Sequence, residues 1–128
     1  MKELKLKYSK IIPFSGFYAI TLFGTVIRRE KWKDVPLDKR TYNHEGIHVC
    51  QAEDFCKGFF GYICFYLLYF LEWFFKGIIS LFTAFKVRAY YSISFEQEAY
   101  NNQNNLLYQD NRKKWAWTKY IFKLVWKH

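Results

Sequence analysis

Residues 59–85, with the sequence FFGYICFYLLYFLEWFFKGIISLFTAF, form the most apolar stretch of the chain. Its only charged residues are Glu72 and Lys76, which stand four apart with the acid first, as in a helical ion pair. As one helix the stretch would measure about 40 Å, more than the ~30 Å hydrocarbon core of a bilayer. It therefore predicts either a membrane-spanning helix or two shorter helices that meet near Gly77.

The chain as a whole is short, rich in aromatic residues, and basic at its ends. It has 128 residues, including 14 Phe, 11 Tyr and 5 Trp, and a net charge of +9. This length fits one domain, and a hydrophobic fraction of 52% excludes disorder. A mean hydropathy of -0.23 argues against a polytopic membrane protein. Residues 1–10 carry +3 and residues 112–128 carry +6, so the excess charge lies at the two ends.

The order of local patterns predicts an α+β fold, a mostly helical single domain with an N-terminal β-hairpin. Gly24 would form the hairpin turn, Asp38 or Thr41 would cap the next helix, and Gly58 would end it. The expected elements are a hairpin at 12–30, helices at 38–57 and 86–111, the apolar stretch at 59–85, and a basic aromatic terminal helix at 112–128.

The helix at 38–57 contains the motif HExxH, written His44-Glu45-Gly46-Ile47-His48. Residues i and i+4 of a helix lie on the same face, so both imidazoles can bind one Zn²⁺. Glu45 lies beside such a site and is the candidate catalytic residue, accepting a proton from water and passing it to a leaving amine. Two surface histidines on a helix are the simpler alternative.

A catalytic zinc usually has a third protein ligand and one position left for water. The acidic cluster Phe95-Glu-Gln-Glu-Ala-Tyr100 provides two candidates about 50 residues beyond the motif. Glu96 and Glu98 point about 160° apart on a helix, so we expect only one of them to reach the metal.

Together, His44-Glu-Gly-Ile-His-Val-Cys-Gln51 and Phe95–Tyr100 resemble the glutamate-type zinc metallopeptidases, or gluzincins, and more closely small bacterial proteins with an HExIHxxQ…FExEAY pattern. The resemblance covers roughly residues 12–101 and implies zinc-dependent peptide hydrolysis. Aligning Ala99 with the alanine of the family's ExxAD-like helix implies that Glu96 is the third ligand, with Glu98 in reserve. Tyr100 replaces the usual aspartate, and Gln51 is a candidate for the hydrogen bond to a zinc histidine.

A shared metal constrains the apolar stretch. Ligand atoms of His44, His48 and Glu96 would all lie about 2 Å from the ion. A single span at 59–85 would place them on opposite sides of a bilayer, so we expect a helical hairpin that turns between Trp73 and Gly77. Each arm is then too short to span, and the hairpin is either a soluble core element or partly embedded in a membrane.

The terminal segment interleaves lysines with aromatic residues. Lys119, Lys123 and Lys127 repeat every four residues, so they would form one stripe on the expected helix. Three interpretations are open, in order of preference: packing on the core, contact with an anionic membrane surface, and stacking on nucleic acid, which no RNP-like, KH or helix-turn-helix pattern accompanies. The candidate contact residues are Lys114, Trp115, Trp117, Lys119, Lys123, Trp126 and Lys127.

The sequence thus predicts a zinc metallopeptidase acting on a peptide or protein substrate. No secretory signal is recognisable and the three cysteines form no framework, so we expect a cytoplasmic protein, peripheral on the inner membrane face if its basic end binds lipid. Two other classes remain as alternatives: a non-catalytic membrane-surface protein with a structural or degenerate metal site, and a nucleic-acid-binding module using the basic ends.

Overall fold

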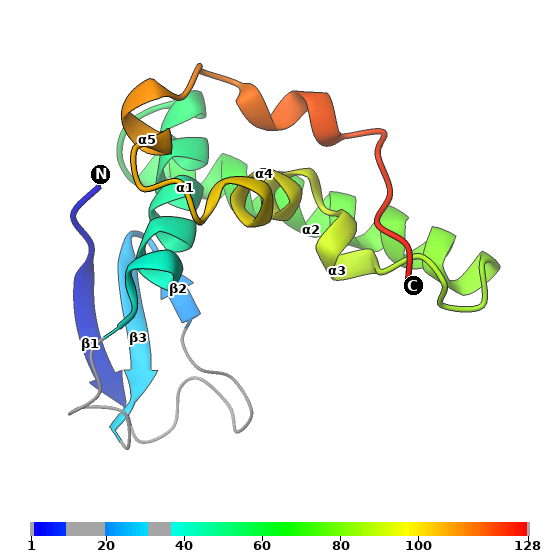
Figure 1. Cartoon of the computed structure of the whole chain (residues 1–128), viewed down its shortest axis with the longest axis horizontal. Helices are drawn as coiled ribbons and strands as arrows, with labels where there is room; N and C mark the ends of the chain where they lie inside the picture. The colour runs from blue at the N-terminus through cyan, green and yellow to red at the C-terminus, as the bar shows by residue number, and fades with distance from the viewer. Residues whose placement is uncertain (1, 10–19, 31–36, 128) are drawn as a thin grey trace.

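The computed structural model describes residues 2–9, 20–30 and 37–127. A small sheet lies at one end, and helices form the rest of a single α+β domain (Figure 1). The strands are β1 (Lys5–Ser9), β2 (Ile20–Leu22) and β3 (Thr25–Arg29). The helices are α1 (Lys39–Phe55), α2 (Phe59–Phe82), α3 (Ala89–Ser92), α4 (Ser94–Asn102), α5 (Tyr108–Asn111) and the 3₁₀ helix η2 (Ala116–Tyr120).

The sheet contains the predicted hairpin turn and one additional strand. Strands β2 and β3 are antiparallel, and Phe23 and Gly24 join them with φ values of 51° and 82°. The first part of the hairpin expected at 12–30 lies outside the described residues. Strand β1 was not predicted; it runs parallel to β3, which makes β3 the central strand.

Helix α1 begins and ends close to the predicted boundaries. Asp38 is the cap, because its Oδ1 accepts a hydrogen bond from the Thr41 amide at 2.6 Å. The chain leaves α1 after Phe55 and turns through Gly58, whose φ of 95° favours glycine. The turn brings α2 against α1.

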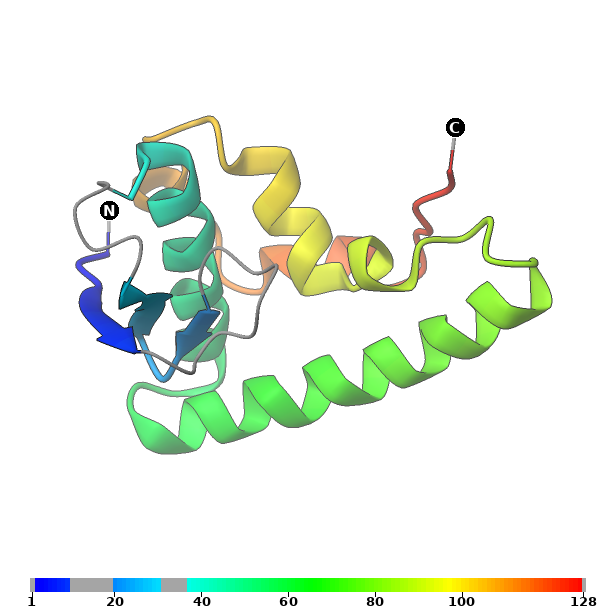
Figure 2. The ribbon, with the colours of Figure 1, turned by 90° about the horizontal axis from the view of Figure 1, so that it is seen from below.

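The predicted hairpin at 59–85 is wrong: α2 is one continuous helix of 24 residues. The chain reverses only after Phe82, where Ala84 and Phe85 have φ values of 54° and 64°. Segments α3 and α4 then run back along α2, as Figure 2 shows. The Tyr69 hydroxyl, about 20 Å before the end of α2, donates to Glu96 of α4. A single long helix is thus compatible with the three-ligand cluster, because the chain returns beside it.

The two C-terminal predictions also need correction. Residues 86–111 form three short helices, with a break at the extended residue Ile93, and not one. Of the predicted terminal helix at 112–128, the described residues 112–127 form η2 and an irregular tail, and not an α-helix. Backbone hydrogen bonds attach the tail to the segment that follows α2. The amide of Lys127 donates to the carbonyl oxygen of Lys86, and the amide of Arg88 donates to that of Val125.

The side chains proposed for membrane contact in the tail therefore do not form one stripe. Trp117 is 7% exposed and belongs to the hydrophobic core, as the preferred interpretation expected. Trp115 and Trp126 are exposed, as are the four lysines of the set: Lys114, Lys119, Lys123 and Lys127. The core lies where α1, α2, α4 and η2 meet, and consists of Ala52, Phe65, Ile93, Phe95 and Trp117.

Candidate metal centre

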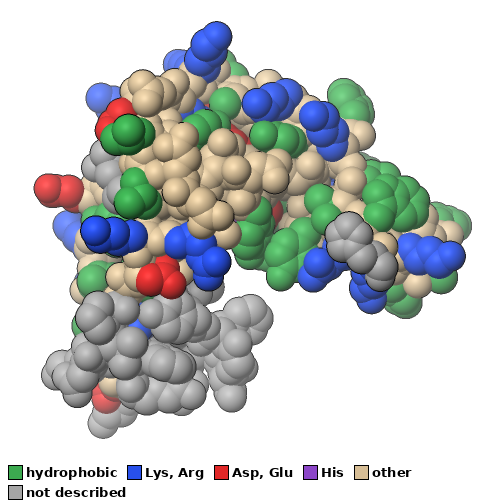
Figure 3. Space-filling view, in the orientation of Figure 1, with side chains coloured by type: hydrophobic (Ala, Val, Ile, Leu, Met, Phe, Trp, Pro, Cys, Tyr) green, Lys and Arg blue, Asp and Glu red, His purple; other side chains and the backbone are tan. Residues whose placement is uncertain are grey.

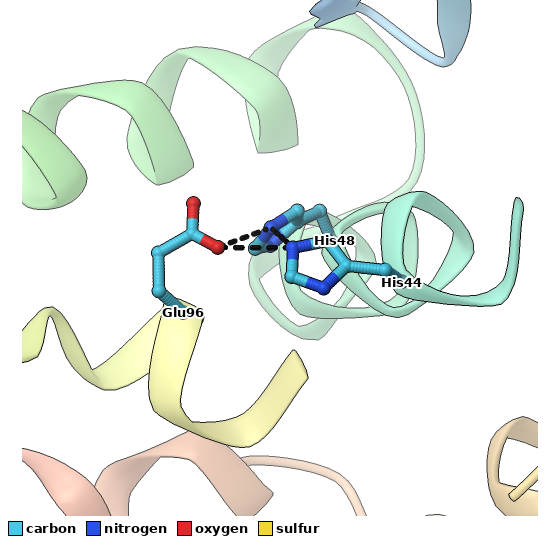
Figure 4. A group of neighbouring side chains, drawn as sticks. All are labelled: His44, His48 and Glu96. Carbon is cyan, nitrogen blue, oxygen red and sulfur yellow. Dashed lines mark hydrogen bonds and ion pairs between the residues drawn. The ribbon is translucent and has the colours of Figure 1, made fainter. Parts of the chain in front are cut away.

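Helices α1 and α4 bring the three predicted ligands together (Figure 4). Oε1 of Glu96 lies 3.0 Å from Nε2 of His44 and 3.1 Å from Nε2 of His48, and the two Nε2 atoms are 3.2 Å apart. The three residues are between 3% and 9% exposed. The i, i+4 spacing on α1 places the two histidines side by side. The chain then returns along α2, which brings Glu96 of α4 to them.

The ligand triangle fits a tetrahedral zinc ion. Bonds of about 2.0–2.1 Å at tetrahedral angles require ligand atoms about 3.3 Å apart. The three ligand atoms form a triangle with edges of 3.0, 3.1 and 3.2 Å. An ion placed roughly 1 Å above the plane of this triangle would lie about 2 Å from all three atoms. The cluster therefore matches the donor set and the dimensions of a zinc site.

Gln51 fixes the orientation of His48. Its amide Nε2 donates to the carbonyl oxygen of Phe95 at 2.9 Å and to Oε1 of Glu98 at 3.0 Å. Both partners are acceptors, so the amide oxygen must face Nδ1 of His48, which lies 2.7 Å away. That nitrogen is then the donor, and Nε2 is left to bind a metal. This is the role that the sequence suggested for Gln51.

His44 is held in the same way by a residue that the sequence did not indicate. Oε1 of Gln103 lies 2.9 Å from its Nδ1, which leaves Nε2 directed at the centre. The ring of Tyr100 packs edge-on against the His44 ring, with 4.5 Å between centroids. Tyr100 thus supports His44 by packing, whereas Gln103 provides the hydrogen bond.

Glu96 is bound at both carboxylate oxygens. Tyr69 donates to Oε2 at 2.6 Å, so Oε1 alone faces the histidines. Burial would raise the pKa of Glu96, but the two imidazoles outweigh it and hold this pKa well below its usual range. Burial likewise opposes protonation of His48, and the Glu96 carboxylate outweighs it, raising the pKa of His48 to about 9.

Glu98, the reserve ligand, lies in a separate ion cluster. It is fully buried, and it accepts hydrogen bonds from Arg112 and Tyr108 at 2.5 and 2.6 Å. Arg112 also binds both carboxylate oxygens of Asp54, at 3.0 and 2.7 Å. Glu98 therefore neutralises Arg112 and positions Gln51, and among the described residues Glu96 is the one acid that joins the two histidines in the cluster.

Glu45 is partly exposed beside the centre. Its negative charge acts on His48, which places it within electrostatic reach of the cluster. Its side chain has no hydrogen bond or ion pair with another described residue. A carboxylate in this position is available to accept a proton from water.

Comparison of the chain with protein-family models, curated proteins and solved structures found no match. The resemblance to gluzincins therefore rests on the two motifs alone.

Three residues of the site had no sequence signal. Tyr69 lies within an apolar stretch rich in aromatic residues, Gln103 lies in an Asn-rich stretch, and Arg112 belongs to the basic tail. Their partners are between 14 and 59 residues away in the chain, as the bonds to Glu96, His44, Glu98 and Asp54 show. Only the packed fold identifies them.

The raised pKa of His48 predicts a pH-dependent stability of the metal-free protein. A group whose pKa rises on folding stabilises the fold below its unfolded pKa, about 6.5, and that contribution is lost as the pH rises through about 9. Protein stripped of metal should lose up to about 3 kcal/mol of unfolding free energy over this range. Denaturant unfolding at both ends of the range measures the loss. His48→Asn should reduce the loss substantially, and an unchanged loss in this variant would contradict the assignment.

Proposed function

We propose that this protein is a zinc-dependent peptidase whose ligands are His44, His48 and Glu96. The convergence of two Nε2 atoms and one carboxylate oxygen within 3.0–3.2 Å of one another is the observation that supports this proposal. Structural zinc sites usually have four protein ligands, whereas catalytic sites have three and leave one position for water. Among the residues that the structure describes, three side chains converge, which favours the catalytic class.

When bound, zinc supplies Lewis acidity that polarises a peptide carbonyl and lowers the pKa of water. Glu45 is the general base that accepts the proton from this water and the general acid that delivers it to the leaving amine. Gln51 and Gln103 hold the two imidazoles with Nε2 toward the ion, and Tyr69 holds Glu96 with Oε1 toward it. The free thiols of Cys50, Cys56 and Cys64 are consistent with a cytoplasmic location.

An aromatic pocket beside the cluster suggests the substrate class. It has a volume of about 370 Å³ and is lined by Tyr66, Tyr69, Phe70, Trp73 and Tyr90. Tyr69 also binds Glu96, and burial together with the charge of Glu96 raises the pKa of Tyr90, so the pocket adjoins the site. A pocket of this composition accepts an apolar side chain. We therefore propose peptides with an aromatic or aliphatic residue next to the cleaved bond as substrates.

The variant Glu45→Gln tests the catalytic assignment. Because Glu45 is not a ligand, this variant should bind zinc stoichiometrically while its rate of peptide hydrolysis falls by about 100-fold or more. Cleavage of a peptide library rich in aromatic residues, followed by mass spectrometry, measures the rate, and metal analysis measures the zinc. Glu53→Gln is the matched control, since Glu53 lies on the same helix and pairs with Lys2 at the surface.

Two outcomes would reject the proposal. Stoichiometric zinc in the parent protein without cleavage of any library peptide would favour a structural or degenerate metal site. Equal rates for the parent protein and Glu45→Gln would show that the observed cleavage does not use this residue as its base.

A further inference from the structure

The outer face of α2 is apolar along its whole length. Twelve residues of α2 have exposed side chains, and every one is Phe, Leu, Ile or Trp. Leu67, Phe70 and Phe75 are each about 60% exposed, and Phe82 is 88% exposed. Of the 18 consecutive residues of this helix with the highest hydropathy, only 17% are buried. Soluble proteins rarely expose continuous apolar surfaces of this extent.

The polar side chains of α2 point inward. Lys76 is 4% exposed, pairs with Glu72 at 2.6 Å and donates to the carbonyl oxygen of Ser92. Glu72 accepts two further hydrogen bonds at 2.6 Å from the amide and hydroxyl of Ser94. A surface helix in water shows the opposite pattern, with charges outside. Charges that face the protein interior and find partners there are typical of helices in contact with hydrocarbon.

The width of this face argues against a single protein partner. At 100° per residue, the exposed positions from Trp73 to Ile79 cover an arc of about 240° around the helix. A docking helix, or a second copy of this chain, would cover a stripe of about 100° and leave the remainder in water. A bilayer, which has no fixed shape, can cover the whole arc.

The domain covers one side of α2 only, which determines how the helix meets a bilayer. Figure 2 shows α2 along one edge of the molecule, with α1, α3 and α4 on its other side. Figure 3 shows a face of the domain on which Lys and Arg side chains are spread out. A spanning orientation would place this charged surface in hydrocarbon at high cost. An in-plane helix keeps the charged surface in water.

Basic residues stand at both ends of the apolar face. Lys57 is exposed just before α2 begins, and Lys86 and Arg88 are exposed just after it ends. Lysine and arginine at the margins of an interfacial helix meet the anionic head groups of lipids. The charge pattern therefore matches the water boundary of a membrane.

We propose that α2 lies in the plane of a lipid bilayer, with its outer face in the hydrocarbon and the rest of the domain in water. This placement goes beyond the proposed peptidase activity and does not depend on it. Phe70 and Trp73 belong both to this face and to the aromatic pocket, so the pocket would open at the boundary between the bilayer and water. It makes the protein monotopic, held by the apolar surface of one helix and not by the basic tail.

Flotation of the full-length protein with lipid vesicles tests the placement. The protein should float with pure phosphatidylcholine and with phosphatidylcholine–phosphatidylglycerol vesicles, and it should remain bound in high salt, because salt screens charges but does not weaken insertion. The double variant Leu67→Glu/Phe74→Glu places two charges in the centre of the exposed face. Its partition coefficient should fall by more than about 100-fold.

The matched control is Asn101→Glu/Asn104→Glu, which adds the same charge at exposed positions outside α2 and should change partitioning by less than about threefold. Circular dichroism checks that both double variants keep the helical content of the parent. Failure of the parent protein to float would overturn the proposal, as would flotation only with phosphatidylglycerol and only in low salt. A soluble dimer of the parent protein that the double variant Leu67→Glu/Phe74→Glu converts to a monomer would also overturn it.

Discussion

Replacing Glu96 with glutamine should abolish the proposed zinc binding. Glutamine has the same shape, but its single amide oxygen is uncharged, is a poor zinc ligand, and cannot both face the ion and accept the Tyr69 hydrogen bond. Zinc binding contributes about 10–16 kcal/mol in four-ligand sites, or about 2.5–4 kcal/mol for each ligand. Zinc affinity should therefore fall roughly 100- to 1,000-fold, and peptide hydrolysis should fall with it. Titration against a competing chelator measures the affinity.

Glu98→Gln is the informative control for this substitution. It is the same chemical change two residues away, at a side chain that binds Arg112, Tyr108 and Gln51 and not the ion. This variant should keep its zinc with at most about a 10- to 100-fold loss of affinity, through Gln51 and His48, while losing stability. Strong zinc binding by Glu96→Gln together with its loss in Glu98→Gln would exchange the roles of the two glutamates.

Arg112→Met should destabilise the fold by about 3–5 kcal/mol, because it leaves Asp54 and Glu98 buried without a counter-charge. The Arg112 side chain is 5% exposed, and its two partners are 5% and 0% exposed. A loss of this size is a large part of the unfolding free energy of a typical domain, which is about 5–15 kcal/mol. We expect the melting temperature to fall by roughly 10–20 °C. Thermal and urea unfolding measure the change.

Two comparisons identify the cause. Lys113→Met removes the same charge from an exposed neighbour and should change stability by less than about 0.5 kcal/mol. Adding Asp54→Asn and Glu98→Gln to Arg112→Met removes the unpaired charges and should recover most of the loss. If the triple variant is no more stable than Arg112→Met, the loss comes from packing and not from uncompensated charge.

The sequence was sufficient to predict those residues of the site that lie close together in the chain. The i, i+4 pair His44 and His48 needs only a helix, and Asp38 marks where that helix begins. The choice of Glu96 over Glu98 came from a resemblance, and the structure brings Glu96 to the histidines. Gln103, Tyr69 and Arg112 could not be predicted, because each acts through contacts with residues distant in the chain.

Two element predictions failed for physical reasons that a sequence does not display. The hairpin at 59–85 was inferred from the need to bring the ligands together, but the chain after Phe82 satisfies that need by running back along α2. The spacing of Lys119, Lys123 and Lys127 by four suggested a terminal helix. Tertiary hydrogen bonds override this pattern, since Gln97 donates to the carbonyl oxygen of Lys123 and Lys127 donates to that of Lys86.

The sequence by itself determined that the stretch 59–85 is apolar and mainly helical, that the HExxH helix presents two imidazoles on one face, and that the excess positive charge lies at the ends of the chain. These properties depend on neighbours within about one helical turn. The tertiary structure alone decided that Glu72 and Lys76 face inward and that the phenylalanines and leucines of α2 face outward. The side of α2 that is covered depends on where α3 and α4 return, and that is a property of the packed chain.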